Sequence, residues 1–358
     1  MQIPEVNIRP CLAYDAICVT NHPGIPWALG LRGLILRLFA NKIFKLINEI
    51  EKCLSGTLKK DRMQHSFSTL CLILSAYVGE DDPTTLSVGS VADIFADAKN
   101  LRRVVAPRIT NEFIRSHIIP TLDNLVDNAG NSYIVHRLRA LASMGFETIW
   151  QERVLPELHK TTNQAMKYLH NQDVSHIFAD ITRMKYCEPI RQIDIIVSYF
   201  SYPVCFALHG TGFLINTYAA NQIKSMIYHE LMHGFANDEL VQAYIAYVQA
   251  DPWMKKRHRQ LLTYSGNEEE FVAAAECYLR LVHSDESYED LLFDLARRNN
   301  HSTAAVLFDL LSQEVEPPTD YNAWLLAQFN SGKLPGGRTR DFIESISRKT
   351  SILRRIFN

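Results

Sequence analysis

Apolar side chains recur at helical spacing along the first half of the chain. They share one helix face from Trp27 to Leu54, and the same spacing returns in four later stretches. Polar linkers separate the stretches, and Ser or Thr opens several of them as an N-cap. The pattern predicts helices over residues 27–54, 66–78, 87–103, 110–128 and 131–171, the last kinked or divided at Pro156.

The pattern changes near Cys187, where β-branched and aromatic residues begin to dominate. Three such stretches predict the strands of a small twisted sheet, with a glycine-containing turn at 209–212 between the second and third. The expected strands are 193–200, 204–208 and 213–218. Helical spacing then resumes, and it predicts C-terminal helices over 287–298, 302–311, 322–328 and 338–357.

A five-residue motif directly follows the predicted strands. His229-Glu230-Leu231-Met232-His233 reads H-E-x-x-H inside a stretch with helical periodicity. Side chains four residues apart lie on one helix face, so the two imidazoles can bind one metal ion while Glu230 holds a water beside it. This pattern is typical of zinc peptidases. The alternative is a pair of solvent-facing histidines on an ordinary helix.

A catalytic zinc needs a third protein ligand. The longer motif that ends in a third histidine is excluded, because Ala236 and Glu239 stand at its Gly and His positions. The acidic run 268–270, with Asn267 as its expected N-cap, is the natural donor. Glu270 is the first choice for the third ligand, because the helix face that carries it continues through small residues and can pack against the helix of His229 and His233. Glu269 is the alternative, and at least two of the three glutamates are expected to be solvated.

These residues resemble the gluzincin zinc metallopeptidases, and most closely the anthrax lethal factor type. The similarity covers about residues 213–283, where the segment from Tyr264 to Phe271 is similar to the stretch that carries that family's third ligand. The resemblance implies Zn²⁺ bound by His229, His233 and Glu270, with Tyr264 stabilising the oxyanion. The spacing from Tyr264 is one residue shorter than in the family, and the family's later glutamate falls on Ala274.

Composition limits the setting of this chemistry. Hydrophobic residues make up 47% and charged residues 21% of the 358 residues, as in ordinary globular proteins. The net charge of −2 creates no electrostatic field that would attract nucleic acid. Seven cysteines without a C-x-x-C pair favour a reducing compartment. With neither a signal peptide nor a transmembrane segment expected, the prediction is a cytoplasmic protein, with delivery into a host cell by a signal-less route as an alternative.

Together these patterns predict a mainly α (α+β) chain. It comprises a helical domain (1–186) of recognition or scaffold role, a zincin-like catalytic core (187–300) and C-terminal helices (301–358). The predicted function is a zinc-dependent endopeptidase in which Glu230 is the general base and the edge strand 204–208 pairs with a protein or peptide substrate. The alternative function is a catalytically silent protein-binding module. The alternative for the sheet is a purely structural role without a substrate. The pattern leaves the oligomeric state open.

Overall fold

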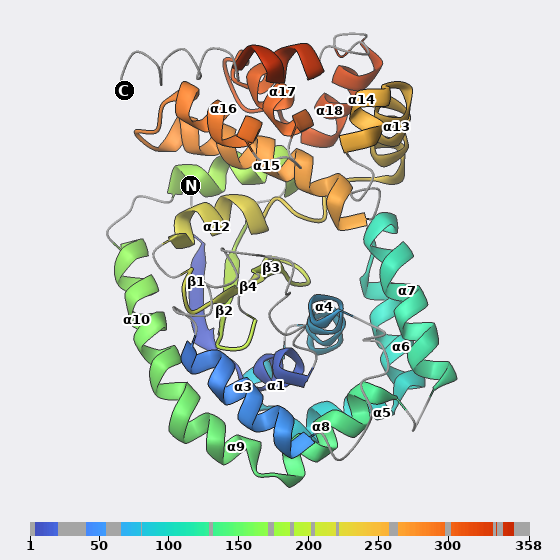
Figure 1. The fold of residues 1–358 in the computed structure, drawn as a ribbon, viewed down its shortest axis with the longest axis vertical. Helices are drawn as coiled ribbons and strands as arrows, with labels where there is room; N and C mark the ends of the chain where they lie inside the picture. Colours follow the sequence, from blue (N-terminus) through green and yellow to red (C-terminus); the bar gives the residue numbers. More distant parts are fainter. Residues whose placement is uncertain are drawn as a thin grey trace.

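A small mixed sheet lies in the interior of the molecule, with helices around it (Figure 1). The computed structural model describes residues 4–20, 41–54, 66–79, 81–128, 132–170, 175–186, 190–201, 205–219, 222–257, 264–297, 302–331, 334 and 339–346. The predicted helical residues 27–40 and 347–357 and the predicted strand residue Val204 lie outside these ranges.

The sheet has four strands in the order β1-β2-β4-β3. These are β1 (Glu5–Pro10), β2 (Gln192–Ser198), β3 (Phe206–Ala207) and β4 (Gly212–Asn216). The strands β1, β2 and β4 run parallel, with Ile8 opposite Ile195 and Ile195 opposite Phe213, whereas β3 is antiparallel to β4. The three strands predicted from sequence are therefore confirmed, and β3 lies at an edge, as expected.

Strand β1 corrects the prediction of a wholly helical first half. It is a partly exposed edge strand that ends at Pro10, and its burial does not alternate cleanly between two faces. A strand with such a weak pattern is recognised only through its partner, which lies more than 180 residues further along the chain.

Helices from the N-terminal half of the chain surround the sheet (Figure 1). They are α1 (Leu12–Thr20), α3 (Asn41–Leu54), α4 (Phe67–Val78), the short η2 (Pro83–Thr85), α5 (Val88–Ala96), α6 (Ala98–Arg108), α7 (Glu112–Asp127), α8 (Tyr133–Ser143), α9 (Phe146–Ile149), the π-helical η3 (Trp150–Val154) and α10 (Leu155–His170). Two short elements follow in the chain: α11 (Ser175–Ile181), which contacts α15 (Tyr264–His283), and the π-helical η4 (Thr182–Tyr186), which contacts α18 (Tyr321–Asn330). Within the described residues the predicted helices are present, but two of them are divided.

The predicted helix 131–171 is interrupted before Pro156. The chain turns at Gly145, which has a φ of 76°, a left-handed conformation that favours glycine. Pro156 follows the π-helical turn η3, which runs directly into α10, so the winding of the helix changes just before Pro156 but the helix does not divide there. The predicted helix 87–103 likewise divides at Asp97, which ends α5 and caps α6.

A buried carboxylate joins α1 to the end of β2. Asp15 Oδ1 accepts hydrogen bonds from Ser198 Oγ (2.5 Å) and from the backbone N–H groups of Tyr199 (2.9 Å) and Phe200 (3.2 Å). Its Oδ2 accepts one from Trp150 Nε1 at 2.7 Å. Burial raises the pKa of Asp15 to about 6, although these donors favour the ionised form.

A second group of helices forms a layer over the other side of the sheet (Figure 1). It contains α12 (Ile223–Glu230), α13 (Asp238–Ala250), α14 (Pro252–Arg257), α15 (Tyr264–His283), α16 (Tyr288–Arg297), α17 (Ser302–Leu311) and α18 (Tyr321–Asn330). The long helix α15 packs against both α12 and α17. Within the described ranges, none of the helices has the length and apolar character needed to cross a membrane.

Candidate metal centre

The helix α12 carries the first histidine of the motif and ends soon after it. Ile223, Ile227 and Tyr228 are buried and hold the helix in place. After Glu230 the chain continues as a tighter turn, in which the N–H of His233 donates to the carbonyl of Glu230 at 3.3 Å. The predicted helix through His233 is therefore too long. The turn still returns His233 to the side of His229.

A buried glutamate holds the turn that follows His233. Glu268 Oε1 accepts hydrogen bonds from the three successive backbone N–H groups of residues 234–236, at 2.9, 3.1 and 3.2 Å. Three N–H groups can point at one oxygen because Gly234 has a φ of 81° and reverses the chain. Glu268 belongs to α15, so this contact also fixes the turn relative to that helix.

Two further elements bind the carbonyl groups of the same turn. The side-chain amide of Asn111, the N-cap of α7, donates to the carbonyls of Gly234 (3.0 Å) and Ala236 (2.9 Å). Lys185 Nζ donates to the carbonyl of Leu231 at 2.7 Å and to that of His233. Side chains from three helical elements thus fix the backbone that carries His233.

Each imidazole has a carboxylate on its Nδ1 atom. His229 Nδ1 lies 3.0 Å from Glu276 Oε2, and His233 Nδ1 lies 3.2 Å from Glu268 Oε2. A carboxylate at Nδ1 favours the tautomer with the proton there, which leaves the Nε2 lone pair for another partner. The two Nε2 atoms lie 3.3 Å apart, so both rings direct their second nitrogen to one place.

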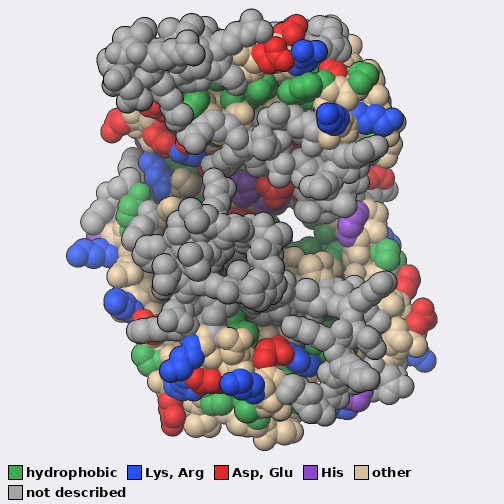
Figure 2. All heavy atoms as spheres, in the orientation of Figure 1, with side chains coloured by type: hydrophobic (Ala, Val, Ile, Leu, Met, Phe, Trp, Pro, Cys, Tyr) green, Lys and Arg blue, Asp and Glu red, His purple; other side chains and the backbone are tan. Residues whose placement is uncertain are grey.

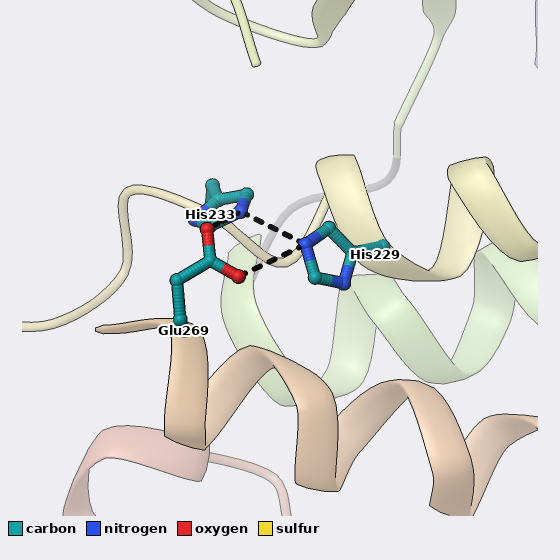
Figure 3. Close-up of side chains that lie close together, drawn as sticks. All are labelled: His229, His233 and Glu269. Atoms are coloured by element: carbon teal, nitrogen blue, oxygen red, sulfur yellow. Dashed lines mark hydrogen bonds and ion pairs between the residues drawn. The ribbon is translucent and has the colours of Figure 1, made fainter. Parts of the chain in front are cut away.

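Glu269 supplies the third donor at that place. Its carboxylate oxygens lie 3.4 Å from His229 Nε2 and 3.5 Å from His233 Nε2. Figure 3 shows Glu269 rising from α15 toward the two imidazoles, which come from the end of α12 and from the turn after it. The three donor atoms lie within 4.8 Å of one another, a spacing at which they could hold one metal ion.

The electrostatics of the group favour a bound cation. Burial disfavours an imidazolium, but the carboxylates of Glu269 and Glu276 outweigh burial and raise the pKa of His229 well above its usual value. Glu268 and Glu269 likewise raise the pKa of His233 against its burial. Three carboxylates around two imidazoles therefore attract positive charge, which a proton or a divalent metal ion can supply.

Glu230 lies beside the two histidines in a buried position. It is 4% exposed, and its Oε2 has no hydrogen-bond partner among the described residues. Burial raises its pKa, while the charges of His229 and His233 act in the opposite direction. A buried carboxylate oxygen without a protein donor suits a group that binds water or transfers a proton.

Glu270, the favoured third ligand in the sequence, is not brought to the histidines. Its side chain is buried, and its Oε2 accepts a hydrogen bond from the N–H of Ala304 at 2.6 Å, in the first turn of α17. Consecutive helix residues point about 100° apart, so Glu269 and Glu270 project from different sides of α15. Here Glu269 faces α12, and Glu270 caps α17.

Two other expectations for α15 are corrected. The helix begins at Tyr264, so Asn267 is not its N-cap. Glu268 and Glu270 are buried and hydrogen-bonded, so at least two solvated glutamates are not present in the acidic run. The side chain of Tyr264 lies outside the described part of the structure.

Sequence reasoning missed the carboxylates that orient the imidazoles. Glu276 lies seven residues after Glu269, and that spacing returns to the same helix face after two turns. This spacing is a signal for a partner on the ligand face. Glu268 left no comparable signal, because its role depends on the turn at 234–236.

Histidine and acidic side chains are visible in a hollow between the layer of α13–α18 and the rest of the molecule (Figure 2).

Comparison with protein-family models, with curated proteins and with solved structures finds no match to this chain. The case for a function therefore depends on the geometry of this site.

Proposed function

We propose that this chain is a zinc-dependent endopeptidase, with His229, His233 and Glu269 as the metal ligands. The observation that carries the proposal is the orientation of the two imidazoles. Carboxylates bind both Nδ1 atoms, so both Nε2 atoms are directed to the place that Glu269 also reaches. Ligating histidines in zinc proteins commonly have this carboxylate partner.

The donor set suits Zn²⁺ among the common metal ions. Two imidazole nitrogens and one carboxylate form the three-ligand set of catalytic zinc sites, whereas calcium and magnesium prefer oxygen ligands. When bound, the ion would polarise the scissile carbonyl and lower the pKa of water. The side chain of Glu269 is 36% exposed, so the site is accessible from solvent.

Glu230 is the proposed general base. Burial raises the pKa of its carboxyl group above the usual value, which makes the carboxylate a better proton acceptor. In the proposed reaction it takes a proton from the attacking water and passes the proton to the leaving amine. Tyr264, at the start of α15, is the proposed donor to the oxyanion, on the basis of the gluzincin resemblance.

The proposed substrate is a protein or peptide that pairs with the edge strand β3. Burial, and to a smaller extent the charge of Glu230, raise the pKa of Cys205, the residue that precedes β3, to about 12. An edge strand can bind an extended peptide through its backbone groups. A net charge of −2 does not favour nucleic acid. We propose a cytoplasmic setting, because the described cysteines form no disulfide.

Zinc content and peptidase activity test the proposal. Wild type should bind about one zinc ion per chain, Glu269→Ala should lose it, and Glu270→Ala should keep it if the protein stays folded. Glu230→Gln should keep zinc but lose turnover of a peptide library. Wild type without zinc after reconstitution would refute the metal site. Zinc binding with equal turnover in wild type and Glu230→Gln would refute the assigned base.

A further inference from the structure

The carboxylate that orients His229 is itself held by a cation. Glu276 uses Oε2 for the Nδ1 of His229, and its Oε1 accepts a hydrogen bond from Arg280 Nη1 at 3.1 Å. The Glu276 side chain is 8% exposed, so it lies largely out of water. Arg280 is four residues further along α15, one turn away on the same face.

Arg280 is fixed on its other side by a second carboxylate. Its Nε donates to Glu286 Oε1 at 2.9 Å, and its Nη2 donates to Glu286 Oε2, so the guanidinium binds this carboxylate through two atoms. Ser284 Oγ in turn donates to Glu286 Oε1 at 3.3 Å. Two hydrogen bonds in one plane fix the orientation of a guanidinium far better than a single contact.

We propose that Arg280 is a positioning residue for the metal centre, which keeps the Glu276 carboxylate against His229 and so keeps the Nε2 of His229 directed at the metal. This inference rests on the proposed function. The sequence of contacts runs from Glu286 through Arg280 and Glu276 to His229.

The physical reason lies in what Glu276 does without its cation. A buried carboxylate that loses its charged partner turns toward solvent. This movement weakens its hydrogen bond to His229 Nδ1, which then no longer fixes the tautomer or the ring orientation. Lysine carries the same charge but cannot bind two carboxylates in the planar geometry of arginine, so it restores the function only in part.

Zinc affinity of the full-length protein tests this role. The variants are Arg280→Met, Arg280→Lys and a control, Arg102→Met, which removes the exposed ion pair between α6 and Asp123 of α7. Affinity is measured by competition with a chromophoric chelator. Loss of a group that orients a ligand typically weakens metal binding 10–100-fold. We expect about a tenfold loss for Arg280→Met, a smaller loss for Arg280→Lys and no change for the control.

A second variant and a second measurement decide the remaining cases. If Arg280→Met does not fold, Glu286→Gln removes the charge that fixes Arg280, and it should weaken zinc binding in the same direction. Crystal structures of metal-free wild type and variant report the distance between Glu276 and His229 without any metal.

The outcomes separate this inference from the proposed function. Wild-type zinc affinity in Arg280→Met, or in Glu286→Gln, would overturn the positioning role and leave the peptidase proposal standing. If wild type binds no zinc, the proposed function fails. The crystal structures then decide alone: a Glu276 carboxylate that keeps its contact with His229 in the variant overturns the role of Arg280, and one that leaves supports it.

Discussion

Replacing Glu268 with glutamine should convert His233 into a poor metal ligand. In wild type, Oε1 of Glu268 accepts three backbone hydrogen bonds and Oε2 faces His233 Nδ1 at 3.2 Å. Glutamine can keep the oxygen on the three N–H groups, but its NH₂ group then faces Nδ1. Because that group only donates, it favours the His233 tautomer with the proton on Nε2, the nitrogen directed at the metal.

The size of the effect follows from these contacts. Loss of the charge weakens four charge-assisted hydrogen bonds, and hydrogen bonds to charged groups contribute about 1.5–3 kcal/mol each, compared with about 1 kcal/mol for neutral ones. Since the acceptor oxygen remains for three of them, we expect a loss of about 2–4 kcal/mol in the free energy of unfolding. The change of tautomer should weaken zinc binding about 100-fold, at the upper end for groups that orient a ligand.

Two assays measure these effects separately. Urea unfolding of the metal-free protein gives the loss of stability, and chelator competition gives the zinc affinity. Asp93→Asn is the control, because Asp93 is exposed and paired with Arg139 in an ion pair between α5 and α8. Zinc affinity within threefold of wild type in Glu268→Gln would refute the tautomer argument. Unchanged stability would show that the three backbone contacts contribute little.

Three further predictions concern the turn and the buried carboxylate of α1. Gly234→Ala should lose about 1–2 kcal/mol of stability and weaken zinc binding, because φ is 81° and a Cβ atom would lie 3.1 Å from a neighbouring side chain. Gly145→Ala is the control: its φ is 76° and a Cβ atom there would meet open space, so it should lose about 1–2 kcal/mol of stability and keep its zinc affinity. Lys185→Met should lower both stability, by about 1–3 kcal/mol, and zinc affinity, because it removes the donor to the carbonyl of His233. The pKa of Asp15 is raised from 3.8 to about 6, so the folded protein holds this proton more tightly than the unfolded chain does; its contribution to stability should fall by about 3 kcal/mol as the pH rises from below 3.8 to above 6. Urea unfolding between pH 4 and 7 should show this fall in wild type relative to Asp15→Asn, and parallel curves would contradict it.

Much of this protein was determined by local pattern alone. The period of the apolar residues indicated most of the described helices, and β-branched stretches indicated β2, β3 and β4. The spacing of His229 and His233 indicated that they would lie together, and they do so even though α12 ends before His233. Four residues span about one turn in a helix and in the tighter turn alike, so this prediction did not depend on helix length.

Other features depended on the tertiary structure. Helical spacing placed Glu269 and Glu270 on different faces of α15, but it did not show which face meets α12. That choice was made when α15 packed between α12 and α17, which turned Glu269 to the histidines and Glu270 to the N–H of Ala304. Strand β1 and the contacts of Glu268 join segments far apart in sequence. Neighbours along the chain determine periodicity, whereas the partner of each face depends on how the whole core packs.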